Sequence, residues 1–105
     1  MPQVLNAHGT GWTGDTLPAG SLYVGRAVVG GWQGGVRFRM SKWRNPFTIG
    51  RRDGTREEVI AKYRAWLPQQ PELLAALHEL AGFDLVCWCS PDPCHTDVLL
   101  ALANA

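Results

Sequence analysis

The run FDLVCWC at residues 83–89 decides the fold class. It is an unbroken series of β-prone residues that follows one predicted helix and precedes another, which is the pattern of a buried strand in an α/β unit. Side chains along a strand point alternately to opposite faces. The alternation assigns one face to Phe83, Leu85, Cys87 and Cys89, and the opposite face to Val86 and Trp88.

Two helices are predicted before this strand. The first begins at Thr55, because Thr55 and Glu58 have the spacing of a capping box, in which each side chain satisfies a free amide of the first turn. This helix ends before Pro68. The second begins at Pro71 and ends near Gly82.

A third helix is predicted after the strand, from about Cys94 or His95. Apolar residues at helical spacing are expected to face the core in all three helices. They are Val59, Ile60, Tyr63, Trp66 and Leu67 in the first, Leu73, Leu74, Leu77 and Leu80 in the second, and Val98, Leu99 and Leu102 in the third.

The N-terminal half carries weaker signals. Residues 4–8 and residues 21–26 read as short strands. Residues 27–54 contain six glycines and no sustained periodicity, although Arg37 and Phe38 fit a short strand. The chain of 105 residues is therefore predicted to be a single α/β domain, with a mostly parallel sheet, about three helices and long glycine-rich loops.

Gly9, Gly11 and Gly14 have the spacing of the dinucleotide-binding motif G-x-G-x-x-G. That motif binds pyrophosphate only where a helix begins and directs its N-terminal amides at the ligand. Here the following residues include Pro18 and Gly20, which disfavour a helix. We therefore interpret the segment as a glycine-rich loop.

The composition predicts a reduced, cytoplasmic protein. An apolar fraction of 46 % is ordinary for a globular domain, so folding requires neither a metal nor a disulfide. No apolar run approaches the length of a membrane span, and the first residues lack the features of a secretory signal. The three cysteines are an odd number, and two are separated by one residue, which is poor geometry for a disulfide framework.

The net charge of +1 hides a segregation of charge. All ten Lys and Arg residues lie between residues 26 and 64, where three acidic residues leave a balance of +7, and the rest of the chain carries −6. Clustered positive charge attracts anionic partners, although an ordinary solvated surface also explains it.

The segment CWCSPDPCH, residues 87–95, contains every cysteine of the chain, and three interpretations of it stay open. The first is a bound zinc ion, because thiolates and imidazole are its usual ligands. The spacing differs from that of common zinc fingers, so the ligands would converge only at a bent strand end. This ligand set is Cys87, Cys89, Cys94 and His95.

The second interpretation is catalysis by a Cys/His pair. Ligands of open α/β sheets collect beyond the carboxyl ends of the strands, where the next helix offers free amides. Cys89 ends the predicted strand and His95 begins the next helix, so the helix N-terminus and the imidazole would both activate the thiol. Asp97 either orients His95 or is a first-turn acid favoured by the helix dipole.

The third interpretation treats Cys87 and Cys94 as inert core residues. His95 would then be a helix-start residue that bonds to the preceding loop.

The basic segment at residues 37–52 interleaves arginines and Lys42 with aromatic residues, which suits phosphate contacts and base stacking. Asn45 can donate and accept hydrogen bonds at once, as base or ribose recognition requires. Arg26 would reach the same sheet edge as Cys89 if the two strands are parallel. We therefore expect Arg26, Lys42 and Asn45 to contact a ligand, although a solvated loop with aromatic plugs is the alternative.

The motifs SKWRNPF (41–47), GTREEVIAKYRAWL (54–67) and LVCWCSPDPCHTDVLL (85–100) resemble the domain-of-unknown-function family 4326 of phage and bacterial genomes, from residue 23 onward. The resemblance implies a shared CWC-x4-CH module of strand, loop and helix, and it implies no activity. The family usually has glycine where this chain has Arg44 and Thr96.

These observations favour a domain that binds a nucleotide or another phosphorylated ligand at the carboxyl edge of the sheet, and that acts on it, if it is an enzyme, through Cys89 and His95. One alternative is a zinc-binding module that docks single-stranded nucleic acid or protein through residues 37–52. Another is a self-associating accessory protein with buried thiols, to which the five tryptophans point.

Overall fold

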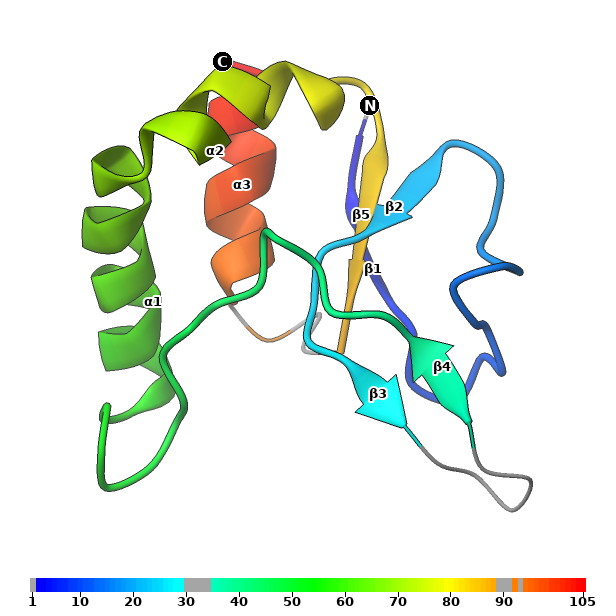
Figure 1. Cartoon of the computed structure of the whole chain (residues 1–105), viewed down its shortest axis with the longest axis horizontal. Helices are drawn as coiled ribbons and strands as arrows, with labels where there is room; N and C mark the ends of the chain where they lie inside the picture. Colours follow the sequence, from blue (N-terminus) through cyan, green and yellow to red (C-terminus); the bar gives the residue numbers. More distant parts are fainter. Residues whose placement is uncertain (1, 30–34, 89–91, 93) are drawn as a thin grey trace.

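The computed structural model describes residues 2–29, 35–88, 92 and 94–105. It is a small α/β domain, as predicted (Figure 1). The strands are β1 (Val4–Asn6), β2 (Ser21–Tyr23), β3 (Val28–Val29), β4 (Val36–Phe38) and β5 (Asp84–Cys87). The helices are α1 (Arg56–Trp66), α2 (Pro71–Ala76) and α3 (His95–Ala103), with 3-10 turns η1 (Leu67–Gln69) and η2 (Leu77–Glu79) after the first two.

Strand β5 is the centre of a parallel sheet in the order β1-β5-β2. Leu85 lies opposite Val4 on one side and Leu22 on the other. Strands β3 and β4 form a separate antiparallel pair. The predicted mostly parallel sheet is thus confirmed, and all its carboxyl ends lie at one edge.

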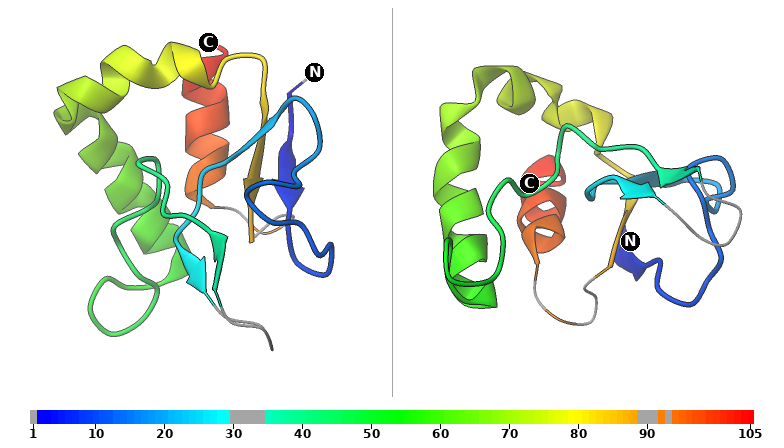
Figure 2. Two further views of the ribbon diagram at one scale, coloured as in Figure 1. Left: turned by 45° about the vertical axis from the view of Figure 1, so that its right-hand side comes forward. Right: turned by 60° about the horizontal axis from the view of Figure 1, so that its bottom comes forward.

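The two faces of β5 enter different parts of the core, as the alternation predicts. Leu85 packs with Tyr63 and Leu99 beneath the helices, whereas Val86 packs with Phe38 in a smaller cluster on the opposite face. Figure 2 shows the three helices together on one side of the parallel sheet.

The predicted helix starts are confirmed, whereas two of the apolar residues predicted to face the core are exposed. Thr55 caps α1, and the capping box with Glu58 is present. Leu74 and Leu102 were expected to be inward, but they are 39 % and 43 % exposed. Leu73 and Leu77, four residues apart, pack against the core, and Leu74 lies about 100° further round the helix, outside that contact.

Leu102 lies in the last turn of α3. It does not face the core but lines a surface groove together with Arg64 and Pro68.

Residues 10–20 form turns and irregular structure where the dinucleotide-binding motif would require a helix. The rejection of that motif is therefore confirmed. Gly9 and Gly11 have φ angles of 76° and 75°, a left-handed conformation that shapes turns. None of the helices in the described ranges has the length and apolar character needed to span a membrane.

Candidate functional site at the carboxyl edge of the sheet

A cavity of about 310 Å³ lies at the carboxyl ends of β2 and β5. Its wall combines apolar side chains, including Phe47 and Ile49, with Arg26, Arg56 and His95. Residues from the first turn of α1 and the start of α3 line it. The parallel pairing of β2 with β5 brings the chain after each strand to this edge, which is where α/β sheets bind ligands.

His95 fastens the start of α3 to the end of β2. Its Nε2 lies 2.8 Å from the carbonyl oxygen of Val24, and a carbonyl only accepts, so this nitrogen carries the proton. The ring also meets the Tyr63 ring edge to face, with centroids 5.1 Å apart. Burial lowers the pKa of His95 from its usual 6.5, so the ring is neutral at pH 7 with Nδ1 as an acceptor.

Arg26 follows the end of β2 and lines the cavity. Its Nη2 donates to the carbonyl oxygens of Asn45 at 2.9 Å and Phe47 at 2.7 Å. The guanidinium thus places a positive charge at the cavity and also fixes the loop that closes it.

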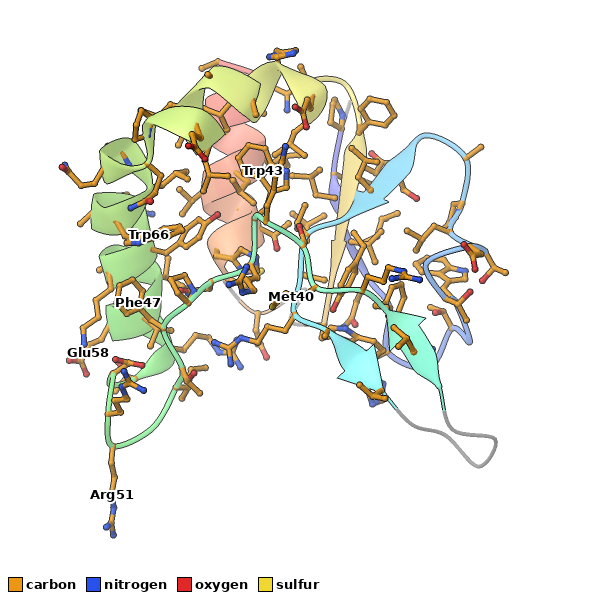
Figure 3. The ribbon with its side chains drawn as sticks, viewed as in Figure 1. Met40, Trp43, Phe47, Arg51, Glu58 and Trp66 are labelled. Atoms are coloured by element: carbon orange, nitrogen blue, oxygen red, sulfur yellow. The ribbon has the colours of Figure 1, made fainter. Side chains whose placement is uncertain are left out.

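Asn45 is buried at the cavity wall, and both ends of its amide bond to the protein. Its Nδ2 donates to the carbonyl oxygen of Val59 at 3.2 Å, and its Oδ1 accepts the N–H of Phe47 at 2.9 Å. These bonds position Phe47 beside α1 (Figure 3), where the Nζ of Lys62 lies 5.9 Å from the centre of the Phe47 ring.

Lys42 is the expected ligand contact that the structure leaves outside the cavity wall. Its Nζ donates to Glu79 at 2.8 Å and lies 5.4 Å from the centre of the Trp43 ring. The salt bridge is half exposed.

Arg56 is the basic residue of the cavity that the sequence reasoning missed. It follows the capping residue Thr55 directly, so it stands at the first position of α1. The sequence contained the information needed to find Arg56. The capping box predicted a helix start at Thr55, next to the basic segment, and the first side chain of that helix would lie near the same sheet edge.

Asp97 caps α3 and lies outside the cavity wall. Its carboxylate accepts the N–H of Cys94 at 3.0 Å. This is the geometry of a first-turn acid, the second of the two roles considered for it.

Cys87 and Cys94 are both buried and both line the cavity. Their sulfur atoms are 3.5 Å apart. Cys89 lies outside the described residues, so neither its catalytic role nor the four-ligand zinc set has a geometry here. Within the ranges that are described, no group of three or more His, Cys, Asp or Glu side chains is placed to hold a metal.

Trp88 supplies a fixed aromatic surface at the cavity. Its indole N–H donates to the hydroxyl of Tyr23 at 2.9 Å. The guanidinium of Arg37 lies 5.1 Å from the Trp88 ring centre and donates through Nε to the carbonyl of Trp12 at 2.7 Å. These contacts hold the ring in place.

The two positions where the family usually has glycine behave differently. Arg44 occupies an ordinary backbone conformation, since every described residue with a positive φ is a glycine. Thr96 is fully buried, and its hydroxyl finds no hydrogen-bond partner in the part of the chain that the structure describes.

The fold and the cavity define a small α/β domain with a ligand-sized site at the carboxyl edge of its parallel sheet. The chain belongs to the family described as domain of unknown function (DUF4326), whose family model matches residues 7–105. It is also similar to the uncharacterized protein R718 of Acanthamoeba polyphaga mimivirus, with 36 % identity over 69 residues. This match covers 65 % of the chain and 48 % of the viral protein, so the chain matches about half of that relative's length. No solved structure matches.

Proposed function

We propose that this domain binds a nucleotide or a similar phosphorylated small molecule in the cavity at the carboxyl edge of the sheet. The observation that carries the proposal is the meeting of two arginines, two helix N-termini and two aromatic side chains at one cavity.

The phosphate would lie near Arg26 and Arg56. Both line the cavity, and guanidinium groups match phosphate oxygens in charge and geometry. The N-termini of α1 and α3 reach the same cavity and add the positive ends of their dipoles. Glu58 and Asp97 cap these helices and offset part of that field, so the arginines carry most of the attraction.

The base would lie against the aromatic part of the wall. Phe47 and Trp88 both line the cavity, and both are held by the protein's own contacts. Aromatic faces stack on bases with little regard to base identity. A volume of about 310 Å³ is at the small end of ligand sites, which favours a mononucleotide over a dinucleotide.

Binding of nucleoside monophosphates by calorimetry tests the proposal, with inorganic phosphate as a separate ligand. Arg56→Ala should weaken binding at least ~10-fold, because a charged hydrogen bond contributes about 1.5–3 kcal/mol. Arg51→Ala is the matched control, since Arg51 is exposed on the neighbouring loop and extends away from the domain (Figure 3). Lys42→Ala should also bind normally, because Lys42 pairs with Glu79.

Two results would count against this function. One is the lack of measurable binding of any nucleotide at millimolar concentration by a folded protein. The other is equal weakening by Arg56→Ala and Arg51→Ala, which would reveal only a diffuse charge effect. A Cys89→Ser variant that binds normally but fails to convert the bound ligand would add a catalytic role for that thiol.

A further inference from the structure

We propose that Cys87 and Cys94 are a reversible disulfide site, oxidised by small peroxides that reach the two thiols through the cavity. The cysteine spacing in the sequence did not suggest this pair, because it lies across the loop between β5 and α3. The site consists of the two thiols and the cavity beside them, and disulfide formation there is a property separate from ligand binding.

The distance between the two sulfurs carries the inference. They are 3.5 Å apart, whereas a disulfide bond is about 2.05 Å long, so the sulfurs must approach by about 1.5 Å. Cys87 is the last residue of β5, and Cys94 stands just before the first helical residue of α3. Both therefore lie at the ends of their elements. The carbonyl oxygen of Cys87 accepts the N–H of Ala7 at 2.8 Å, so most of the approach would fall to Cys94.

Among the residues that the structure describes, the cavity is the open space beside the two thiols. The two residues are only 2 % and 4 % exposed, yet both line the cavity. A protein oxidant would not reach them, whereas hydrogen peroxide is small enough to enter. A thiol that has a second thiol beside it can condense with it to a disulfide after oxidation to the sulfenic acid.

The chemistry takes two steps and consumes one peroxide. One thiol, as its thiolate, attacks a peroxide oxygen; the O–O bond breaks, hydroxide leaves and takes up the thiol proton as water, and the sulfur becomes a sulfenic acid. The second sulfur then attacks the first, the S–S bond forms, the S–O bond breaks, and a second water leaves with the remaining proton. Two thiols lose two electrons, and one hydrogen peroxide becomes two waters.

Oxidation would change the cavity itself, because the bond draws the end of β5 and the start of α3 together in its wall. The expectation that the oxidised form binds a nucleotide more weakly rests on the proposed function. The formation of the bond does not.

The test uses the Cys89→Ser chain, which keeps the described pair and removes the third thiol. Treatment with hydrogen peroxide should lower the intact mass by about 2 Da, one hydrogen lost from each thiol, and dithiothreitol should restore it. Peptide mapping should join the peptides of Cys87 and Cys94. The unmutated chain should give the same crosslink.

Three outcomes would overturn the proposal: a sulfinic or sulfonic acid without a crosslink, a disulfide between two chains, or a crosslink through Cys89 in the unmutated chain. The Cys89→Ser chain keeps both thiols of the pair, and the same crosslink in the unmutated chain guards against an effect of the substitution on folding.

A nucleotide arm separates this proposal from the proposed function. If the crosslink forms and no nucleotide binds either form, the binding function fails and the disulfide site stands. If a nucleotide binds the reduced form and no crosslink appears, the disulfide site fails and the binding function stands.

Discussion

The protonation of His95 makes the stability of the domain depend on pH in a predictable direction. Burial lowers the pKa of His95 in the folded chain, whereas an unfolded histidine takes up a proton near pH 6.5. Below that pH the unfolded chain binds more protons than the folded chain, so the free energy of unfolding falls as pH falls. Between pH 6.5 and pH 5.5 the loss from this one group has an upper limit of about 1 kcal/mol, reached if the folded chain takes up no proton there.

The variant His95→Gln isolates this effect. A glutamine amide can donate to the Val24 carbonyl that accepts from the ring, but it does not titrate. We expect a cost of about 1–2 kcal/mol at pH 8, because the contact with the Tyr63 ring is lost. The decline between pH 6.5 and pH 5.5 should become shallower, by up to about 1 kcal/mol.

Urea denaturation at several pH values between 8 and 5.5 measures both quantities. His78→Gln is the matched control, because His78 is exposed on η2. The reasoning about His95 is refuted if His95→Gln loses as much stability as the parent over this range. It is equally refuted if His78→Gln is the variant that flattens the profile.

Three further substitutions test the packing around the site. Tyr63→Phe removes a buried hydroxyl that donates to the Trp43 carbonyl at 2.8 Å, and urea denaturation should show a loss of about 1–3 kcal/mol; an unchanged midpoint would mean that the bond contributes nothing. Thr96→Val replaces a buried hydroxyl that has no partner in the described ranges, so thermal melting should show no loss, or a gain of up to ~1 kcal/mol; a loss above that would reveal a partner. Gly54→Ala should lower the melting temperature by several degrees, which corresponds to a cost of about 1–3 kcal/mol. The reason is that Gly54 has a φ of 105° and that an added Cβ would lie 2.8 Å from the carboxyl carbon of Glu58. A variant as stable as the parent would contradict the strained geometry.

The elements with strong local signals were predictable from the sequence. The alternation in β5 and the capping box of α1 depend on neighbouring residues only, and both were confirmed. The order of the strands was not predictable, because pairing between β5 and the two N-terminal strands depends on contacts far apart in the chain. The exposure of Leu74 was not predictable, because Leu73 and Leu74 both fit the apolar spacing and only the docking of α2 decides which of them faces the core.

The location of the site was predictable from the sequence, but several of the contacts that its residues make were not. Parallel strands bring their carboxyl ends together, so Arg26 and His95 could be expected at one edge, and both line the cavity. The pairing of Lys42 with Glu79 joins residues with no local pattern in common. The approach of Cys87 to Cys94 depends on the path of the loop between them, which spacing alone does not determine.

The central position of β5 in the sheet has a consequence for folding during synthesis on the ribosome. Strands β1 and β2 leave the ribosome long before β5, and they cannot pair with each other, because the position between them belongs to a segment not yet made. The sheet therefore assembles in one late event that closes two long loops at once, which makes such topologies slow to fold. A nascent chain stalled before β5 would present two unsatisfied strand edges to its neighbours, which is the condition under which polypeptides aggregate.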